Sequence, residues 1–442
     1  MQFLFIHHHL ALGGIATLMA RMSAWLIQHD HEVVVMFPWD GPGKELFAGS
    51  VRLLFLGNHF EKLKRSGSRY ARHVIHTHFP LREFDALIAF SSPALWVAAG
   101  IHNALPCASR LCAGAWTPGD YSHTGLRGYL RDPGSFVFHR QLSPANRLYM
   151  SHQAMREIEA RAGGSVPGAI WPLPVDGRPY QATPHRPVKG LIVSVGRLAD
   201  MKTYNFHMVE VVRSLQARGL DIRWHIYGDG PDRPRLETMI AAAGLADRIS
   251  LKGSIDYHLL PEVMRTAFVF VGMGTALIEA GFSGVPSIPA IVYAKDASSY
   301  GYLYDLPGYE CGASLPLPRV PMATLIAKLY HMNSTEYSNE SLLTQKHADR
   351  FALHPLMDLF QRHIAEMRLT KQVFRPACLC VLSQWLVSAY NSAPLVRVRR
   401  GLHLMRDPQV GTPACMLLSL IILAVRHPRC FGCLHRVMRA LL

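Results

Sequence analysis

The chain has 442 residues, too many for one compact core and enough for two domains with an appendage. Apolar residues make up 49% and charged residues 17%, which excludes long disorder and is typical of a folded globular protein. The net charge of +15 gathers at one end, because residues 371–442 hold ten Lys or Arg and one acid, Asp407, and so contribute +9. Nucleic acid is the least favoured partner, since this basic segment is apolar and lacks interleaved aromatic residues for base stacking.

The N-terminal residues and the spacing of the cysteines favour a cytoplasmic protein. The apolar run at residues 1–6 is short and lacks the basic residues of a secretory signal, and we interpret the three histidines that follow it as native. The eight cysteines are scattered, which favours reduced thiols. Neither the pair Cys378 and Cys380 nor the pair Cys430 and Cys433 completes a four-ligand zinc site, so we expect no metal and no cofactor.

The first half of the chain alternates apolar runs with helical spacing. A strand is predicted over residues 3–6, then a loop with Gly13 and Gly14, then a helix over residues 15–28. Further apolar runs predict strands at 32–37, 86–90, 108–112 and 147–150, with a helix near 93–101. This alternation indicates an open, doubly wound parallel sheet.

The second half repeats this alternation after a segment rich in Gly and Pro, residues 163–187, which we interpret as a linker. Strands are predicted over residues 191–195, 222–227, 249–252 and 267–271. Helices are predicted from Phe206 to a stop at Gly219, and over 234–243, 259–265 and 275–282. We therefore expect two Rossmann-like domains at 1–180 and 181–336, a helical segment at 337–370 that packs back on the first domain, and a helical extension at 371–442.

Several residues lie where strands of the second half end, and ligands of parallel sheets bind at such ends. Arg197 and Lys202 flank a helix N-terminus and could hold a diphosphate, or could be solvated surface charges. Gly274 and Thr275 form another strand-to-helix turn. This turn could let backbone amides approach phosphate oxygens, or it could be an ordinary turn without a ligand. Glu279, one turn later, can accept both hydroxyls of a ribose or simply stabilise the helix N-terminus.

Taken together these residues resemble one known family. Its C-terminal domain is matched in order and spacing over about a hundred residues by Val195-Gly196-Arg197-Leu198, Lys202, Tyr227-Gly228-Asp229-Gly230-Pro231, Leu251-Lys252-Gly253 and Ile278-Glu279-Ala280 through Gly284-Val285-Pro286. The family is that of the retaining glycosyltransferases of family 4. Gly13-Gly14 and Pro172-Leu173-Pro174-Val175-Asp176 are similar to its N-terminal and interdomain segments in a weaker way. The resemblance implies the two-domain GT-B fold, with a nucleotide-sugar donor in the cleft between the domains.

The resemblance also implies residue roles. Arg197 and Lys202 would stabilise the leaving diphosphate without a metal ion, and Glu279 would hold the ribose. Gly13 and Gly14 would close over the donor from the other domain. The remaining donor-binding residues would be Gly228, then Gly253, Ser254 and Ile255 near the base, and Met273, Gly274 and Thr275 near the phosphates and the sugar. The acceptor would be a saccharide or lipid-linked saccharide in surface-polysaccharide or lipopolysaccharide synthesis, with the anomeric configuration retained.

The sequence departs from the family at two positions. The family pairs the ribose glutamate with another glutamate eight residues earlier, where this chain has Val271. A histidine usually follows the fifth strand of the first domain; here Asp120 and His123 come shortly after that place and are candidates for the reacting centre. Two alternatives stay open. A sugar-nucleotide epimerase has the same architecture, and Val271 would also suit a catalytically weakened homologue that acts as a partner subunit.

The extension at 371–442 combines an apolar stretch with arginines. The run at residues 414–425 is shorter than the roughly twenty residues that a spanning helix needs. Basic residues precede and follow it, including Arg400 and Arg426. This pattern predicts a peripheral anchor on the anionic cytoplasmic face of the membrane, and the alternative is a helix packed on the domains or a self-association surface.

Overall fold

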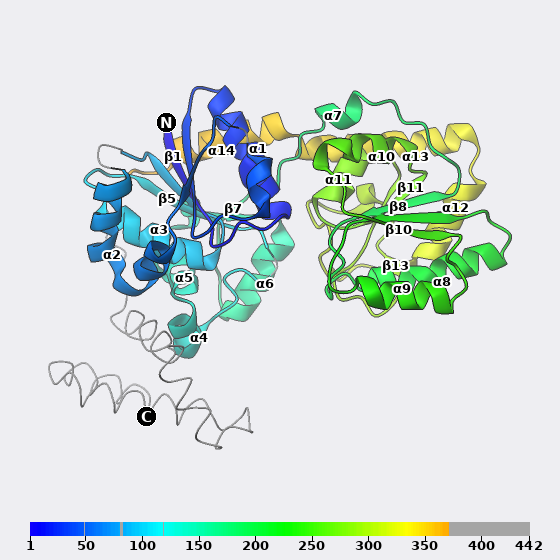
Figure 1. Cartoon of the computed structure of the whole chain (residues 1–442), viewed down its shortest axis with the longest axis horizontal. Coiled ribbons are helices and arrows are strands. Elements are labelled where there is room, and N and C mark those ends of the chain that lie inside the picture. The colour runs from blue at the N-terminus through cyan, green and yellow to red at the C-terminus, as the bar shows by residue number, and fades with distance from the viewer. Residues whose placement is uncertain (48, 80–82, 118, 371–442) are drawn as a thin grey trace, which may run out of the picture.

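The structure is a computed structural model, and it describes residues 1–47, 49–79, 83–117 and 119–370. The predicted extension at 371–442 and its membrane anchor lie outside the described residues. The described chain forms two α/β halves, the first in blue and cyan and the second in green and yellow (Figure 1). Within this part of the chain, no helix is both long enough and apolar enough to cross a membrane.

The first half is built on a seven-stranded parallel sheet in the order β3-β2-β1-β4-β5-β6-β7. Its strands are β1 (Gln2–Ile6), β2 (Glu32–Phe37), β3 (Arg52–Phe55), β4 (Ala86–Ala89), β5 (Arg110–Ala115), β6 (Arg147–Tyr149) and β7 (Ala169–Ile170). The helices are α1 (Gly14–Gln28), α2 (Asn58–His78), α3 (Ser92–Ala104), α4 (Gly125–Arg131), α5 (Pro133–Phe136) and α6 (His152–Ala162). Five consecutive residues of β2 are buried, as in a strand that is covered on both faces.

The second half has a five-stranded parallel sheet in the order β10-β9-β8-β11-β12. Its strands are β8 (Leu191–Val195), β9 (Arg223–Tyr227), β10 (Ile249–Gly253), β11 (Val269–Gly272) and β12 (Ser287–Pro289), beside an antiparallel pair of β13 (Ser298–Ser299) and β14 (Val320–Pro321). The helices are α8 (Tyr204–Ala217), α9 (Arg233–Ala242), α10 (Leu260–Thr266), α11 (Thr275–Phe282) and α12 (Met322–His331). The order of elements expected from the sequence is confirmed here.

The segment interpreted as a linker, residues 163–187, is more structured than its composition indicates. It contains β7, which pairs with β6 through Leu148 and Ala169, and the short helix α7 (Arg178–Gln181). A strand of two residues is too short to show a periodic pattern, so only its pairing with β6 reveals it. The strand β3 and the helix α2 were likewise not predicted.

The two last described helices divide between the halves. Helix α13 (Ser334–Ala348) lies against α11 of the second half. Helix α14 (Leu353–Glu366) crosses to the first half and packs on α1, where Trp25 Nε1 donates to His354 Nδ1 at 3.0 Å. Of the segment expected to pack back on the first domain, α14 is therefore the part that does so.

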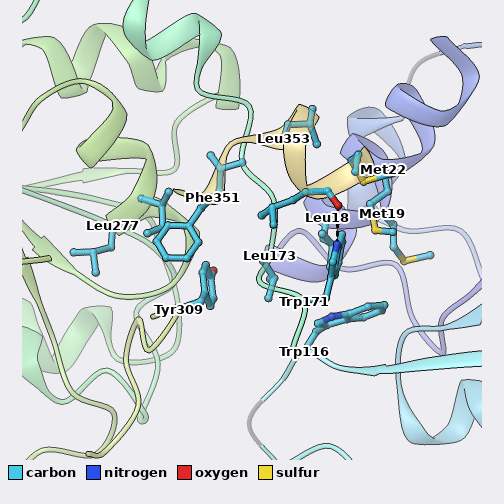
Figure 2. Packing of buried hydrophobic residues seen from close by; sticks show 14 of the residues in the cluster. Leu18, Met19, Met22, Trp116, Trp171, Leu173, Leu277, Tyr309, Phe351 and Leu353 are labelled. Atoms are coloured by element: carbon cyan, nitrogen blue, oxygen red, sulfur yellow. Dashed lines mark hydrogen bonds between the residues drawn. The ribbon is translucent and has the colours of Figure 1, made fainter. Parts of the chain in front are cut away.

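One hydrophobic cluster joins the two halves. Figure 2 shows Leu18 and Met22 of α1 beside Trp171 on one side and Leu277 of α11 on the other, with Leu173 and Phe351 between them. Trp171 Nε1 donates to the carbonyl oxygen of Leu356 at 2.8 Å, which fixes this ring inside the cluster. Because both halves contribute to this core, the walls of the cleft beside it are held relative to each other.

Candidate donor-binding cleft

A cavity of about 480 Å³ lies between the two halves. The first half contributes the loop before α1, the segment after β5 and one side of α6 from Gln153 to Arg161. The second half contributes the end of β8, the loop between β11 and α11, and the segment at residues 309–313. The predicted site residues that line it are Gly13, Gly14, Asp120, Arg197, Lys202, Met273, Gly274, Thr275 and Glu279.

Lys202 reaches the cleft because a glycine stands at the end of β8. A Cβ atom placed on Gly196 would lie 2.1 Å from Lys202 Nζ, and Gly196 has a φ of +143°. The ammonium therefore lies against the strand end, a position that any larger residue at 196 would fill. Burial lowers the pKa of Lys202 to about 8. Arg197, the next residue after Gly196, is exposed on the same wall of the cavity.

The turn before α11 places a helix N-terminus on the same cavity. Gly274 has a φ of +72°, in the region that favours glycine, and among the described residues other than its two chain neighbours no heavy atom lies within 4 Å of the position of a Cβ atom there. The first amides of a helix have no partner within the helix, and Thr275 and Ala276 of this turn line the cavity. Two cations and a helix N-terminus thus face one space, which suits a phosphorylated ligand.

Glu279 is buried and is held by both halves. Its Oε1 atom accepts from Arg21 Nη2 at 2.5 Å and from the Tyr257 hydroxyl at 2.7 Å. Arg21 belongs to α1 and also donates to the carbonyl oxygen of Pro174 at 3.1 Å. Burial by itself lowers the pKa of Arg21, but Tyr257 and Glu279 raise it by more than burial lowers it, so the net shift of the pKa is upward. Glu279 Oε2 receives no hydrogen bond from any residue of the described ranges, so this oxygen remains available as an acceptor.

The sequence alone did not predict Arg21 and Tyr257 as site residues. Arg21 interrupts the apolar pattern of α1 as any surface arginine would, and the residue that it contacts lies 258 positions away. The Tyr257 ring is adjacent to the same guanidinium, at 5.4 Å from its centroid to the Arg21 Cζ atom. No local signal distinguishes such residues from ordinary polar ones.

Other predicted site residues do not line the cavity. Gly228 and Gly253 pair with each other at the strand ends, where Gly228 N donates to the carbonyl oxygen of Gly253 at 2.7 Å. Ser254 and Ile255 follow them and are also absent from the cavity lining. A Cβ atom on Gly228 would lie 2.2 Å from the Gly196 carbonyl oxygen, so Gly228 allows the end of β9 to approach that of β8. Its role here is to shape the wall that carries Lys202.

Asp120 and His123 separate in the structure. Asp120 lines the cavity, its Oδ2 atom accepts from the Thr117 amide at 3.0 Å, and burial raises its pKa to about 7. His123 instead faces Asp132, with Nδ1 3.6 Å from Oδ2, and does not line the cavity. Of the two, Asp120 alone is in place to contact a ligand.

Val271 lies in the interior rather than on the cleft. It is 0% exposed in β11 and belongs to the core of the second half with Ile192 and Ile288. The position at which the family resemblance leads us to expect a carboxylate is therefore apolar and enclosed. Any carboxylate that contacts a bound sugar must come from another segment.

Three consecutive histidines gather after β1. The rings of His7, His8 and His9 lie 4.3 to 4.6 Å apart, and one ring nitrogen from each lies within 4.8 Å of the others. Burial lowers all three pKa values, so the imidazoles are neutral near pH 7. Neutral imidazoles at this spacing could serve as metal ligands, a geometry that the sequence analysis did not foresee. The cluster is not part of the cavity lining.

Comparison with known proteins bears on the second half above all. Residues 181–293 match the family model described as Glycosyl transferases group 1. The chain is 36% identical over 74 residues to an alpha-D-kanosaminyltransferase of Streptomyces kanamyceticus, a stretch that covers 17% of this chain and 19% of that one. It is 33% identical over 125 residues to the putative colanic acid biosynthesis glycosyltransferase WcaL of Salmonella typhimurium, over 24% of this chain and 30% of that one. These matches span less than a third of either relative.

Solved structures match over a longer range. Anabaena Alr3699/HepE, in complex with UDP and glucose, superposes with a TM-score of 0.63 at 15% identity, over 83% of this chain and 100% of that one. WaaG, a glycosyltransferase involved in lipopolysaccharide biosynthesis, superposes with a TM-score of 0.53 at 14% identity, over 83% and 100%. The chain has the GT-B fold, and its residues 181–293 resemble the group 1 glycosyltransferases.

Proposed function

We propose, from the GT-B fold and the group 1 glycosyltransferase match of residues 181–293, that this chain transfers a sugar from a nucleotide-diphosphate sugar. One observation carries the proposal: Lys202, Arg197 and the N-terminus of α11 face the same cavity, on which Glu279 also lies. A nucleotide diphosphate has the complementary groups, with a diphosphate for the cations and ribose hydroxyls for the carboxylate.

The chemistry follows from where charge develops. As the bond to the sugar breaks, negative charge accumulates on the departing diphosphate. Arg197, Lys202 and the α11 amides would stabilise that charge, so the reaction needs no metal ion. Glu279 would accept the ribose hydroxyls on Oε2, because Arg21 and Tyr257 already use Oε1. These contacts hold the donor with its leaving group against the second half.

The acceptor then approaches from the first half. A Cβ atom on Gly13 or Gly14 would have no heavy atom within 4 Å from the part of the chain that the structure describes, the two chain neighbours aside, so this loop leaves space above the donor. An acceptor hydroxyl that attacks on the face of the leaving group retains the anomeric configuration, and Asp120 is the residue of the first half placed to contact it. The acceptor is a saccharide or lipid-linked saccharide of cell-surface glycan synthesis, in keeping with the colanic acid and lipopolysaccharide functions named for the similar proteins.

A thermal-shift screen tests the donor assignment. UDP, GDP, ADP and their sugars are added to the full chain. The nucleotides that carry one of these bases are expected to raise Tm, because a ligand at 100 times its Kd stabilises the folded chain by about 2.7 kcal/mol. The stabilising sugar nucleotide is then incubated with and without saccharide acceptors. The absence of any stabilising nucleotide would contradict the proposal, and isomerisation of the donor without acceptor would indicate an epimerase instead.

The buried Val271 favours one second candidate function. A homologue with a weakened centre could bind the donor and act as a partner subunit of an active enzyme. It would show nucleotide-dependent stabilisation but no transfer with any acceptor. Transfer by the isolated chain excludes this role as its sole function.

The pKa of Lys202 predicts a pH dependence of diphosphate binding. Its ammonium loses its proton above about pH 8 in the free protein, whereas a bound diphosphate favours the protonated form. We expect the Kd for the nucleotide diphosphate to rise about tenfold per pH unit above that point, measured by calorimetry from pH 7 to 10. The variant Lys202→Arg stays charged and should lose this dependence. The same rise in both proteins would contradict the assignment.

The extension at 371–442 is proposed as a peripheral anchor at the cytoplasmic face of the membrane. Deleting it should abolish co-sedimentation with vesicles that contain anionic lipid, because it supplies both the apolar run and ten basic residues. The intact chain should also lose binding when salt is raised, since a Debye length shortens to about 3 Å at 1 M. Persistent binding of the deleted chain would show that another surface contacts the membrane.

A further inference from the structure

The segment at residues 309–313 forms a fixed wall of the cavity. Tyr309 is buried, and its ring packs edge-on against Phe351 with centroids 5.4 Å apart (Figure 2). The carbonyl oxygen of Cys311 accepts from the Gly274 amide at 2.9 Å. A Cβ atom on Gly312, whose φ is +121°, would lie 3.2 Å from Met273 Cβ. The segment is thus held on one side of residue 310 by the packing of Tyr309 on Phe351, and on the other side by the contacts of Cys311 and Gly312 with the loop that precedes α11.

Glu310 stands in this wall with one oxygen unsatisfied. The residue is 4% exposed and lines the cavity. Its Oε1 atom accepts from the backbone amide of Gln153, in the first turn of α6, at 3.2 Å. Its Oε2 atom is buried without a hydrogen-bond partner, and no residue in the described ranges forms an ion pair with it. A buried carboxylate oxygen without a donor is costly, so a donor from a ligand would relieve this site.

A purely structural role as a helix cap explains the position of only one carboxylate oxygen of Glu310. The N-terminus of α6 already has a cap, because Ser151 Oγ accepts from the Ala154 amide at 3.1 Å. The bond from Gln153 accounts for Glu310 Oε1 alone. Capping therefore gives no reason for the second oxygen to be buried beside the cavity.

The cleft has a carboxylate at Glu310 and none at Val271. Val271 is enclosed in the core, whereas Glu310 lines the cavity. The two residues that follow Glu310 contact Gly274 and Met273, which are expected next to the phosphates and the sugar. We propose that Glu310 Oε2 accepts a hydrogen bond from a hydroxyl group of the transferred sugar. This inference rests on the proposed function, and it identifies Glu310 as a residue that binds and selects the donor sugar.

Calorimetry on the full chain with two ligands tests this role. The ligands are the nucleoside diphosphate found in the thermal-shift screen and the corresponding nucleotide sugar. In Glu310→Gln, the side-chain carbonyl can still accept from the Gln153 amide, but the charge and one acceptor are lost. We expect about tenfold weaker binding of the nucleotide sugar and less than about twofold change for the diphosphate, the size of one hydrogen bond to a charged group.

Two matched variants define the comparison. Glu210→Gln removes an exposed carboxylate outside the cavity lining, which pairs with Arg213 at 2.8 Å, and should change neither affinity. Lys202→Ala should weaken both ligands, because both carry the diphosphate. If Glu310→Gln weakens both ligands equally or neither, the assignment of Glu310 is overturned while the proposed function stands. If the unchanged chain binds neither ligand, the proposed function and the role of Glu310 are both contradicted.

Discussion

Replacing Lys202 or Arg197 with alanine should lower kcat for sugar transfer by about 100-fold or more. Each removes one preorganised charge from the place where the leaving diphosphate becomes negative, and the loss of one such donor costs about 3 kcal/mol of transition-state stabilisation. Steady-state kinetics with saturating acceptor would measure the effect. The Lys202 ammonium should be the more sensitive of the two, because it is partly buried against Gly196 whereas Arg197 is exposed.

The control for this experiment is a cation outside the cleft on the same half. Arg213 of α8 forms an exposed pair with Glu210, and Arg213→Ala should leave kcat unchanged. Circular dichroism of each variant separates loss of chemistry from loss of fold. A variant of Lys202 and a variant of Arg197 that both turn over at the normal rate would remove the diphosphate assignment.

Replacing Arg21 with methionine should destabilise the folded chain by about 3–5 kcal/mol. The side chains of Arg21 and Glu279 are 9% and 2% exposed, and removal of one partner leaves an uncompensated charge in the interior. Urea unfolding followed by tryptophan fluorescence would measure the free energy of unfolding. The expected order of stability is the unchanged chain, then Arg21→Met/Glu279→Gln, then Arg21→Met.

The double variant is informative because Glu279→Gln removes the stranded charge yet keeps an acceptor for the Tyr257 hydroxyl. Recovery of most of the lost free energy would show that the cost is electrostatic rather than a packing defect. The exposed pair of Arg213 and Glu210 again supplies the contrast, since Arg213→Met should leave the unfolding free energy unchanged within error. An equal loss in the single and the double variant would contradict this interpretation.

The sequence predicts the strands, helices and strand-end residues of the second half in detail, because the signals for them are local. A strand, a glycine turn and a helix follow one another in the chain, so the residues at each strand end can be read from their neighbours. Lys202, Gly274 and Glu279 were found in this way, and the structure brings all three to one cavity. The residues predicted to lie near the base, Gly253 to Ile255, follow a strand end in the same way, yet they do not line that cavity.

The sequence by itself determined the fold class, the order of strands and helices in the second half, and the cations at the end of β8. Only the tertiary structure decided how the two halves meet. Arg21 contacts Glu279 across 258 positions, and Glu310 contacts Gln153 across 157. Such pairs carry no periodic signal, because they depend on where α14 and the shared core set one half against the other. The sequence shows that residue 271 is a valine where the family resemblance leads us to expect a glutamate. Only the tertiary structure shows that the carboxylate of Glu310 lies at the cavity.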